Sequence, residues 1–255
     1  MIELKTAREI ERMRQAGQVV AGLLKHLSGL VRPGVKTQLL DDEARVYLHE
    51  QGAAPAFLGY RGYPALICVS VNEEVVHGIP GSRKIGDGDL VSLDAGAVVE
   101  GMYADAAVTV IVGEAPAQAR RLVETTRQAL EVGIAQAVVG NRISDISHAV
   151  QQSVERAGFG VVREFVGHGI GRALHEDPPI PNFGPAHMGP RLQPGMVLAI
   201  EPMVTLGRHD VEVLADGWTA VTKDRSLAAH WEHTIAVTEH GPDVLTAGDA
   251  KGRSD

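Results

Sequence analysis

The fold is decided by the stretch KIGDGDLVSLD, residues 84–94, because RLQPGMVLAIE at residues 191–201 repeats its pattern 107 residues later (191 minus 84). In each stretch a basic residue and a glycine lead into an apolar run that is typical of a β-strand. Asp94 in the first stretch is matched by Glu201 in the second. Two related halves that face each other would therefore bring these two carboxylates together at their junction.

The segments around these stretches repeat in the same order. Apolar periodicity predicts helices from the Thr6 cap to Leu30, from Thr37 to about Glu50, and at 117–139 and 143–156. Runs rich in Val and Ile predict strands at 65–71, 89–97, 102–112, 161–166, 196–204, 211–215 and 230–237. Equivalent glycines lie 106 residues apart, at Gly34 and Gly140 and at Gly52 and Gly158. This order predicts a duplicated architecture, followed by a polar, frayed tail at 247–255.

The composition favours a soluble globular protein of the cytoplasm. Of the 255 residues, 44% are apolar and 22% are charged, and the net charge of −8 comes without any basic run that nucleic-acid binding would require. The single cysteine, Cys68, excludes an intramolecular disulfide. No signal-peptide core is present, and no apolar run reaches the about 18 residues of a membrane span.

Four carboxylates interrupt strand-like apolar runs: Asp94, Asp105, Glu201 and Glu232. Each of them alone could face solvent from a one-sided strand. Together they are harder to explain in this way, because buried carboxylates need positive partners and these strands carry few cationic residues. Two divalent cations would balance four carboxylates. Mixed carboxylate and imidazole ligands suit Mn, Fe, Co or Zn, and a bridged pair of ions would activate a shared water.

Competing catalytic motifs are missing. His175-Glu176 continues as Asp-Pro-Pro, which excludes an HExxH zinc helix, and residues 230–233 do not form the inverted motif. No GxSxG elbow occurs. The stretch GHGIG at 167–171 resembles a dinucleotide loop only superficially, because it lacks the spacing of the third glycine in GxGxxG and no obvious helix opens after it.

Five segments together resemble the type I methionine aminopeptidases in order and spacing, over about residues 2–244. The segments are PALICVSVNEEVVHGIP, VSLDAG with YADAAVTV, EFVGHGIGRALHEDP, LAIEPM and DGWTAVTKDRSLAAHWEHTIAVTE. The resemblance implies the pita-bread fold, an α+β architecture with a central antiparallel sheet, outer helices and pseudo-twofold halves. It also implies a single catalytic domain at 1–246 with halves of about 1–115 and 116–246, and a disordered tail at 247–255.

The resemblance further implies a dinuclear metal site. Its ligands would be Asp94, Asp105, His168, Glu201 and Glu232. Asp105 and Glu232 would bridge two divalent ions, with Asp94 completing one site and His168 and Glu201 the other. The ions would be Co, Mn, Fe or Zn, a choice that the ligand types leave open.

A mechanism follows from the same resemblance. A metal-bridged hydroxide would attack the first peptide carbonyl, with Glu201 as proton shuttle and the free substrate amine on a metal. His175 would stabilise the developing oxyanion and His77 would hydrogen-bond the peptide, so neither would be a ligand. The expected reaction is removal of N-terminal methionine from nascent proteins with a small second residue. The remaining histidines, such as His26, His49 and His148, are expected at the surface.

The methionine pocket implied by the family combines aromatic and apolar side chains. It maps to Phe57, Tyr60, Tyr63, Cys68, Leu174 and Trp218, with His77 at its edge. Each of these residues alone would also fit ordinary core packing. Leu174 stands where relatives often carry an aromatic residue, and Val76 replaces a common cysteine, but both keep the pocket apolar.

Three other kinds of protein share the fold that the resemblance implies. Proline-specific peptidases of the same fold usually carry a large extra N-terminal domain, whereas here the first catalytic-type motif starts by residue 65. A type II enzyme would have a long insert between His175 and Glu201, but only 25 residues, 176–200, intervene. A metal-free binding protein on this fold would lack ligands, and all five are present. The expected partners are nascent N-termini and a transient ribosome contact, and the expected state is a monomer.

Overall fold

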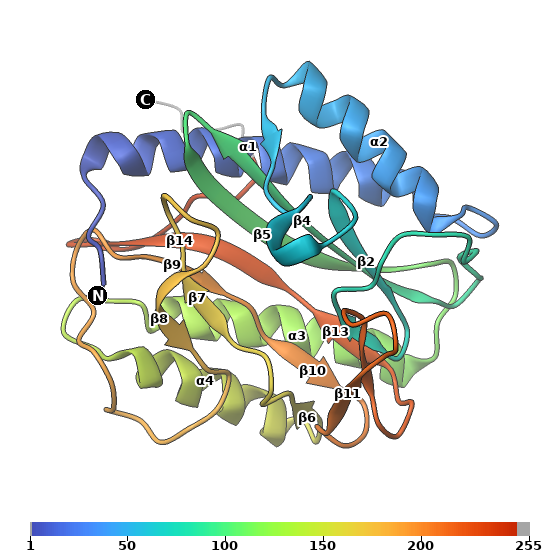
Figure 1. Cartoon of the computed structure of the whole chain (residues 1–255). Coiled ribbons are helices and arrows are strands. Elements are labelled where there is room, and N and C mark those ends of the chain that lie inside the picture. The colour runs from blue at the N-terminus through green and yellow to red at the C-terminus, as the bar shows by residue number, and fades with distance from the viewer. Residues whose placement is uncertain (1, 249–255) are drawn as a thin grey trace, which may run out of the picture.

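The computed structural model describes residues 2–248 and has the expected α+β fold (Figure 1). Its helices are α1 (Ala7–Leu30), α2 (Thr37–Glu50), α3 (Ala117–Ala135) and α4 (Ile143–Arg156), with a short 3-10 helix η1 (Tyr60–Gly62). The strands are β1 (Ala54–Pro55), β2 (Ile67–Val71), β3 (Glu74–Val76), β4 (Leu90–Val99), β5 (Met102–Ile111), β6 (Gly160–Val161), β7 (Gly167–Gly169), β8 (Glu176–Ile180), β9 (Val197–Ile200), β10 (Met203–Thr205), β11 (Val211–Val213), β12 (Ala220–Thr222), β13 (Ala228–His230), β14 (Glu232–Thr238) and β15 (Gly241–Val244). Among the described residues, no helix combines the length and the apolar composition needed to cross a membrane.

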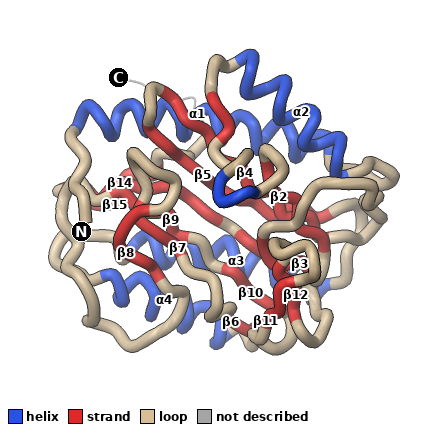
Figure 2. Tube along the Cα trace, in the orientation of Figure 1, coloured by secondary structure: helices blue, strands red, loops and turns tan. Residues whose placement is uncertain are grey.

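One large antiparallel sheet runs through both halves of the molecule (Figure 2). Its strand order is β1-β4-β5-β14-β9-β7-β8, with β2 added beside β4 and β15 beside β14. The first half supplies β4 and β5, and the second supplies β14, β9, β7 and β8, so β5 and β14 form the seam between the halves. Two three-stranded sheets, β13-β10-β6 and β11-β12-β3, complete the structure.

A pair of helices covers each half of the sheet, with α1 and α2 along the top of Figure 1 and α3 and α4 along the bottom. Helix α1 forms because a capping box starts it: Glu9 N–H donates to Thr6 Oγ1 at 3.3 Å, and Thr6 N–H donates to Glu9 Oε2 at 2.9 Å. Its apolar stripe, including the fully buried Leu23 and Leu27, packs towards β4 and β5. This burial of apolar area is the main stabilising contribution.

The duplication predicted from the sequence is seen in the structure, where the two halves have equivalent helices and equivalent backbone contacts. Helices α2 and α4 are both 14 residues long and begin 106 residues apart (143 minus 37). Isolated β-bridges join Lys36 to Lys84 in the first half and Arg142 to Arg191 in the second. The equivalent loop glycines Gly34 and Gly140 have φ angles of 88° and 98°, which only glycine adopts without strain. The prediction of pseudo-twofold halves is therefore confirmed.

Several predicted boundaries were wrong. The run 196–204 is not one strand: it divides into β9 and β10 at Glu201-Pro202, because proline has no N–H for the sheet. The run 161–166 contributes only β6, and Arg163 and Glu164 beyond it are exposed. The run 230–237 is shared by β13 and β14, and α3 ends at Ala135 rather than at 139. Of the predicted tail 247–255, the residues Ala247 and Gly248 are exposed coil, and 249–255 lie outside the described residues.

Candidate metal centre

The first half contributes two carboxylates from one hairpin. Strands β4 and β5 are joined by a tight turn in which Glu100 and Gly101 have φ angles of 48° and 77°, the geometry of a two-residue hairpin loop. The register sets Asp94 opposite Ala107 and Asp105 opposite Gly96. The predicted hairpin is confirmed, and it holds the two acidic side chains on neighbouring strands of the large sheet.

The second half contributes its acidic and imidazole groups from three separate places. His168 lies in β7 opposite Ala199 of β9, and Glu201 comes directly after β9. Glu232 is the first residue of β14 and lies opposite Ala107 of β5, across the seam. Thr234, two residues further along β14, places its hydroxyl 3.0 Å from Asp105 Oδ1 and so fixes that carboxyl from the other half.

The glycines beside His168 serve close strand packing. A Cβ at Gly167 would lie 2.4 Å from the carbonyl oxygen of Ala199, and one at Gly169 would lie 2.1 Å from that of Asp177. Any side chain at either position would push β7 away from its neighbouring strands. The glycine spacing that superficially resembles a nucleotide loop therefore has a packing cause, and it lets the His168 backbone approach the other strands.

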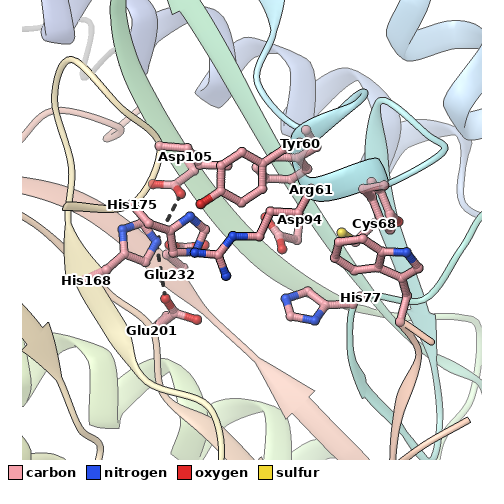
Figure 3. A pocket seen from close by; sticks show the side chains of 14 residues that line it. Tyr60, Arg61, Cys68, His77, Asp94, Asp105, His168, His175, Glu201 and Glu232 are labelled. Atoms are coloured by element: carbon pink, nitrogen blue, oxygen red, sulfur yellow. Dashed lines mark ion pairs between the residues drawn. The ribbon is translucent and has the colours of Figure 1, made fainter.

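The five predicted ligands converge at the seam (Figure 3). His168 Nε2 lies 3.5 Å from Asp105 Oδ2 and 3.6 Å from Glu201 Oε1. His168 Nδ1 lies 2.9 Å from the Gly169 carbonyl oxygen, which can only accept, so the ring proton belongs on Nδ1 and the Nε2 lone pair faces the carboxylates. Asp105, His168 and Glu232 each offer a ligand atom, and these atoms lie within 4.8 Å of one another.

The electrostatics of the cluster call for positive charge. Burial, and then the neighbouring Asp105 carboxyl, raise the pKa of Asp94, Glu201 and Glu232. Asp94 Oδ1 is buried and has no hydrogen-bond partner among residues 2–248. Several acidic groups packed together, one imidazole lone pair and one unpartnered carboxylate oxygen form a donor set that fits divalent cations.

A cavity of about 130 Å³ opens beside the acidic cluster. It is lined by Phe57, Tyr60, Arg61, Tyr63, Cys68, His77, Asp94, Asp105, His168, Leu174, His175, Glu201, Trp218 and Glu232. In Figure 3 Asp105, Glu201, Glu232 and His168 lie to the left, Asp94 lies near the centre, and Cys68 lies towards the right. Tyr63 is buried, and its hydroxyl lies 3.1 Å from the carbonyl oxygens of both Ile67 and Gly78. All six predicted pocket side chains line this one cavity.

Two further imidazoles face the cavity without joining the acidic cluster directly. The His175 ring stacks on Tyr60 at 5.1 Å and lies 4.0 Å from the His168 ring, between ring centroids. Burial, and then nearby positive groups, lower the pKa of His175 to about 3, and burial also lowers the pKa of His77. Both rings are therefore neutral at pH 7 and each carries one N–H donor. His77 has a φ of 62°, a strained conformation typical of functional sites.

Sequence reasoning missed two residues. Of the described residues that line the cavity, Arg61 alone carries a permanent positive charge, and its φ of 49° marks a strained backbone. His230 is 2% exposed, so the expectation that the remaining histidines lie at the surface was wrong for it. His26 and His49 are exposed as expected, whereas His148 is partly buried. The signal was available, because alternation in a strand sets residue 230 on the same face as Glu232.

Comparison with known proteins places the chain among metallopeptidases. The sequence model described as metallopeptidase family M24 matches residues 11–239. Methionine aminopeptidase 1 of Bacillus subtilis is 52% identical over 246 residues, which cover 96% of this chain and 99% of that protein. Methionine aminopeptidase 1 of Mycobacterium tuberculosis is 48% identical and covers 97% of this chain and 96% of its own.

Solved structures give the same result for the fold. The crystal structure of methionine aminopeptidase from Thermotoga maritima matches with a TM-score of 0.95 at 49% identity, covering 96% of this chain and 99% of that one. Prolidase from Pyrococcus furiosus matches with a TM-score of 0.80 at 22% identity, covering 96% of this chain and 66% of its own. At that lower identity the likeness shows the fold alone.

Proposed function

The chain belongs to metallopeptidase family M24 and, within it, to the methionine aminopeptidases, and we propose that the acidic cluster at the seam holds the divalent metal with which it removes N-terminal methionine. The observation that carries this proposal is the convergence of Asp105, His168 and Glu232 from both halves on one cavity that also has aromatic and apolar lining residues. A metal site that shares a small cavity with an apolar side-chain pocket suits recognition of one terminal residue beside the reacting bond.

In more detail, we propose that five side chains act as ligands for two divalent ions. Asp105 and Glu232, which lie on the neighbouring strands β5 and β14 with ligand atoms within 4.8 Å of each other, would help to hold both ions. Asp94 would complete one set, and His168 with Glu201 the other. The unpartnered Asp94 Oδ1 supports a role for this carboxylate, since a buried oxygen without a partner is costly unless a cation occupies it. The donor types allow Co, Mn, Fe or Zn.

The chain's own residues divide the remaining work. Divalent cations bound here would polarise the scissile carbonyl and activate water for attack. Glu201 takes the proton of the attacking water and passes it to the leaving amide nitrogen. His175, a neutral N–H donor in contact with His168, stabilises the negative charge that develops on the carbonyl oxygen. His77 donates a hydrogen bond to the peptide and orients it.

The apolar end of the cavity would accept the methionine side chain. Tyr63 and Trp218 meet edge to face with their ring centroids 5.1 Å apart, and Phe57, Cys68 and Leu174 are buried beside them. Tyr60 holds the His175 ring at the rim by stacking on it. Leu174 fills its position without an aromatic ring and leaves the surface apolar.

The setting of the reaction is also proposed. Residues 1–246 act as one catalytic domain with halves of about 1–115 and 116–246, because the ligand set is complete only when both halves meet. The substrates are nascent polypeptide N-termini in the cytoplasm. The chain works as a monomer, since one chain supplies every proposed site residue. Substrates that are still being synthesised imply a transient contact with the ribosome.

The discriminating experiment is a comparison of three tripeptides. With Mn²⁺ present, Met-Ala-Ser should be cleaved and Ala-Ala-Ser and Pro-Ala-Ser should be left intact, as measured by release of the first amino acid. Cleavage of Pro-Ala-Ser in preference to Met-Ala-Ser would assign the chain to a proline-specific peptidase and overturn the proposal.

A further inference from the structure

His230 is a buried histidine that the mechanism described above does not use. It is the last residue of β13, is 2% exposed and does not line the cavity. Its Nε2 has no hydrogen-bond partner in the described part of the chain. The acceptor that this nitrogen faces is Glu201 Oε2, at 3.8 Å. An unpaired buried ring nitrogen costs free energy, so its orientation towards a catalytic carboxylate requires an explanation.

The backbone of His230 is fixed from the other half of the molecule. Its N–H donates to Thr109 Oγ1 at 2.9 Å, and the Thr109 hydroxyl donates back to the His230 carbonyl oxygen at 2.8 Å. The Ser92 hydroxyl lies 2.9 Å from the same Thr109 oxygen. On the other side of β13, the backbone of His230 pairs with Met203 of β10. These bonds hold the main chain of His230 to the hairpin β4–β5 that carries Asp94 and Asp105.

The Glu201 carboxylate lies between two imidazoles. Its Oε1 is 3.6 Å from His168 Nε2, on the side of the acidic cluster, and its Oε2 is 3.8 Å from His230 Nε2, behind the cavity wall. Neither separation is a formed hydrogen bond. Hydrogen bonds of catalytic groups are often long in the free enzyme and shorten when substrate is bound. A small rotation of the Glu201 carboxylate about its terminal bond would bring Oε2 from 3.8 Å to hydrogen-bond distance of His230 Nε2.

We propose that His230 is a positioning residue that donates a hydrogen bond from Nε2 to Glu201 Oε2 and thereby presents Glu201 Oε1 to the reacting centre. The proposal deepens the proposed function and rests on the role of Glu201 in it. A carboxylate that follows a broken strand would otherwise rotate freely about its terminal bond, and the proton-accepting oxygen would not be defined. His230 removes this freedom without touching the substrate.

Two amide replacements test the position of the donor. The amide of His230→Gln can reach the place of Nε2, whereas that of His230→Asn reaches only the place of Nδ1. We expect His230→Gln to keep kcat within about threefold, and His230→Asn and His230→Leu to lose about 10- to 100-fold in kcat with KM little changed. His148→Leu, which removes a partly buried imidazole from α4, is the control and should match the wild type.

A second readout does not depend on activity. Calorimetric titration of the metal-free protein with Mn²⁺ should show affinity reduced about tenfold in His230→Leu and His230→Asn, restored in His230→Gln, and stoichiometry unchanged in all three. Unchanged kcat in His230→Leu, or a His230→Gln as impaired as His230→Asn at equal thermal stability, would overturn the proposal. Loss of one bound Mn²⁺ would make His230 a ligand instead. If the wild type fails to cleave Met-Ala-Ser, the proposed function is wrong, and the affinity series still tests His230.

Discussion

The two halves share one backbone plan but hold their functional groups differently. In the first half, β4 and β5 are ten residues each, and both carboxylates stay inside continuous strands. In the second half the equivalent strand, β9, is four residues long and ends just before Glu201-Pro202. His168 and Glu232 then come from two other short or interrupted regions of the sheet.

The difference separates rigid from adjustable groups. Side chains within a paired hairpin have their direction set by the sheet, so Asp94 and Asp105 are suited to hold a cation in place. Glu201 has left the strand register and lies between the imidazoles of His168 and His230, which suits the proton transfer proposed for it. In the proposed mechanism the first half would thus supply two ligands fixed within a hairpin, and the second half would supply three further ligands, among them the proton shuttle.

The largest expected effect on activity is the difference between substitutions of Asp94 and Glu201, which occupy equivalent positions in the two halves. Glu201→Gln should lower kcat by at least about 10³-fold even at saturating Mn²⁺, because it removes both a ligand and the proton shuttle. Asp94→Asn should chiefly weaken metal binding, so raising the Mn²⁺ concentration should restore kcat to at least about tenfold above that of Glu201→Gln. Initial rates on Met-Ala-Ser over a Mn²⁺ series measure both.

The control for this pair is the wild-type protein after dialysis against EDTA. It should lose its activity and regain it when a divalent ion is added. Equal, metal-independent residual activity in Asp94→Asn and Glu201→Gln would show that the two halves do not differ in role. Activity that survives thorough chelation would contradict the metal site altogether.

Substitutions of His175 and His77, the two neutral imidazoles proposed to face the substrate, should have intermediate effects on activity that differ in size. His175→Ala, from the second half, should lower kcat about 10²- to 10³-fold through loss of a donor to the developing oxyanion. His77→Ala, from the first half, should cost about one peptide hydrogen bond, roughly tenfold in kcat/KM. Steady-state kinetics on Met-Ala-Ser distinguish the two, and the reverse order would exchange the roles assigned to them.

The smallest expected effect is on stability, at the equivalent loop glycines that the two halves have in common. An added Cβ at Gly34 or Gly140 would meet no heavy atom within 4 Å, so Gly34→Ala and Gly140→Ala differ from the wild type only in backbone strain. Each should lower the free energy of unfolding by about 1–2 kcal/mol with kcat unchanged. Urea denaturation measures this, and a cost at only one of the two positions would argue that the loops are no longer equivalent.

Much of the fold was predictable, because local patterns specify it. Helices α2 and α4 begin and end where periodicity and the closing glycines predict, at 37–50 and 143–156. The hairpin of β4 and β5 follows from two apolar runs with a tight turn between them. The errors fell where a single residue changed the outcome, above all at Pro202, which ends a run that otherwise continues as a strand.

The candidate site was predictable in its residue types and less so in its arrangement. Carboxylates within apolar runs pointed to a shared centre, and the resemblance assigned them to a ligand set. His230 was overlooked because the alternation that sets it on the same face as Glu232 does not show which group its side chain meets. Its direction depends on Thr109, which lies 121 residues away along the chain.

The sequence by itself determined the order of the elements, the duplication and which side chains carry charge, because periodicity, capping and turn chemistry act over a few residues. Only the tertiary structure decided that β14 pairs with β5, so that Glu232 and Asp105 meet across the seam. Only the tertiary structure, too, set Glu201 between His168 and His230. Strand pairing joins backbone groups that are far apart in the chain, and no local pattern specifies which strands become neighbours.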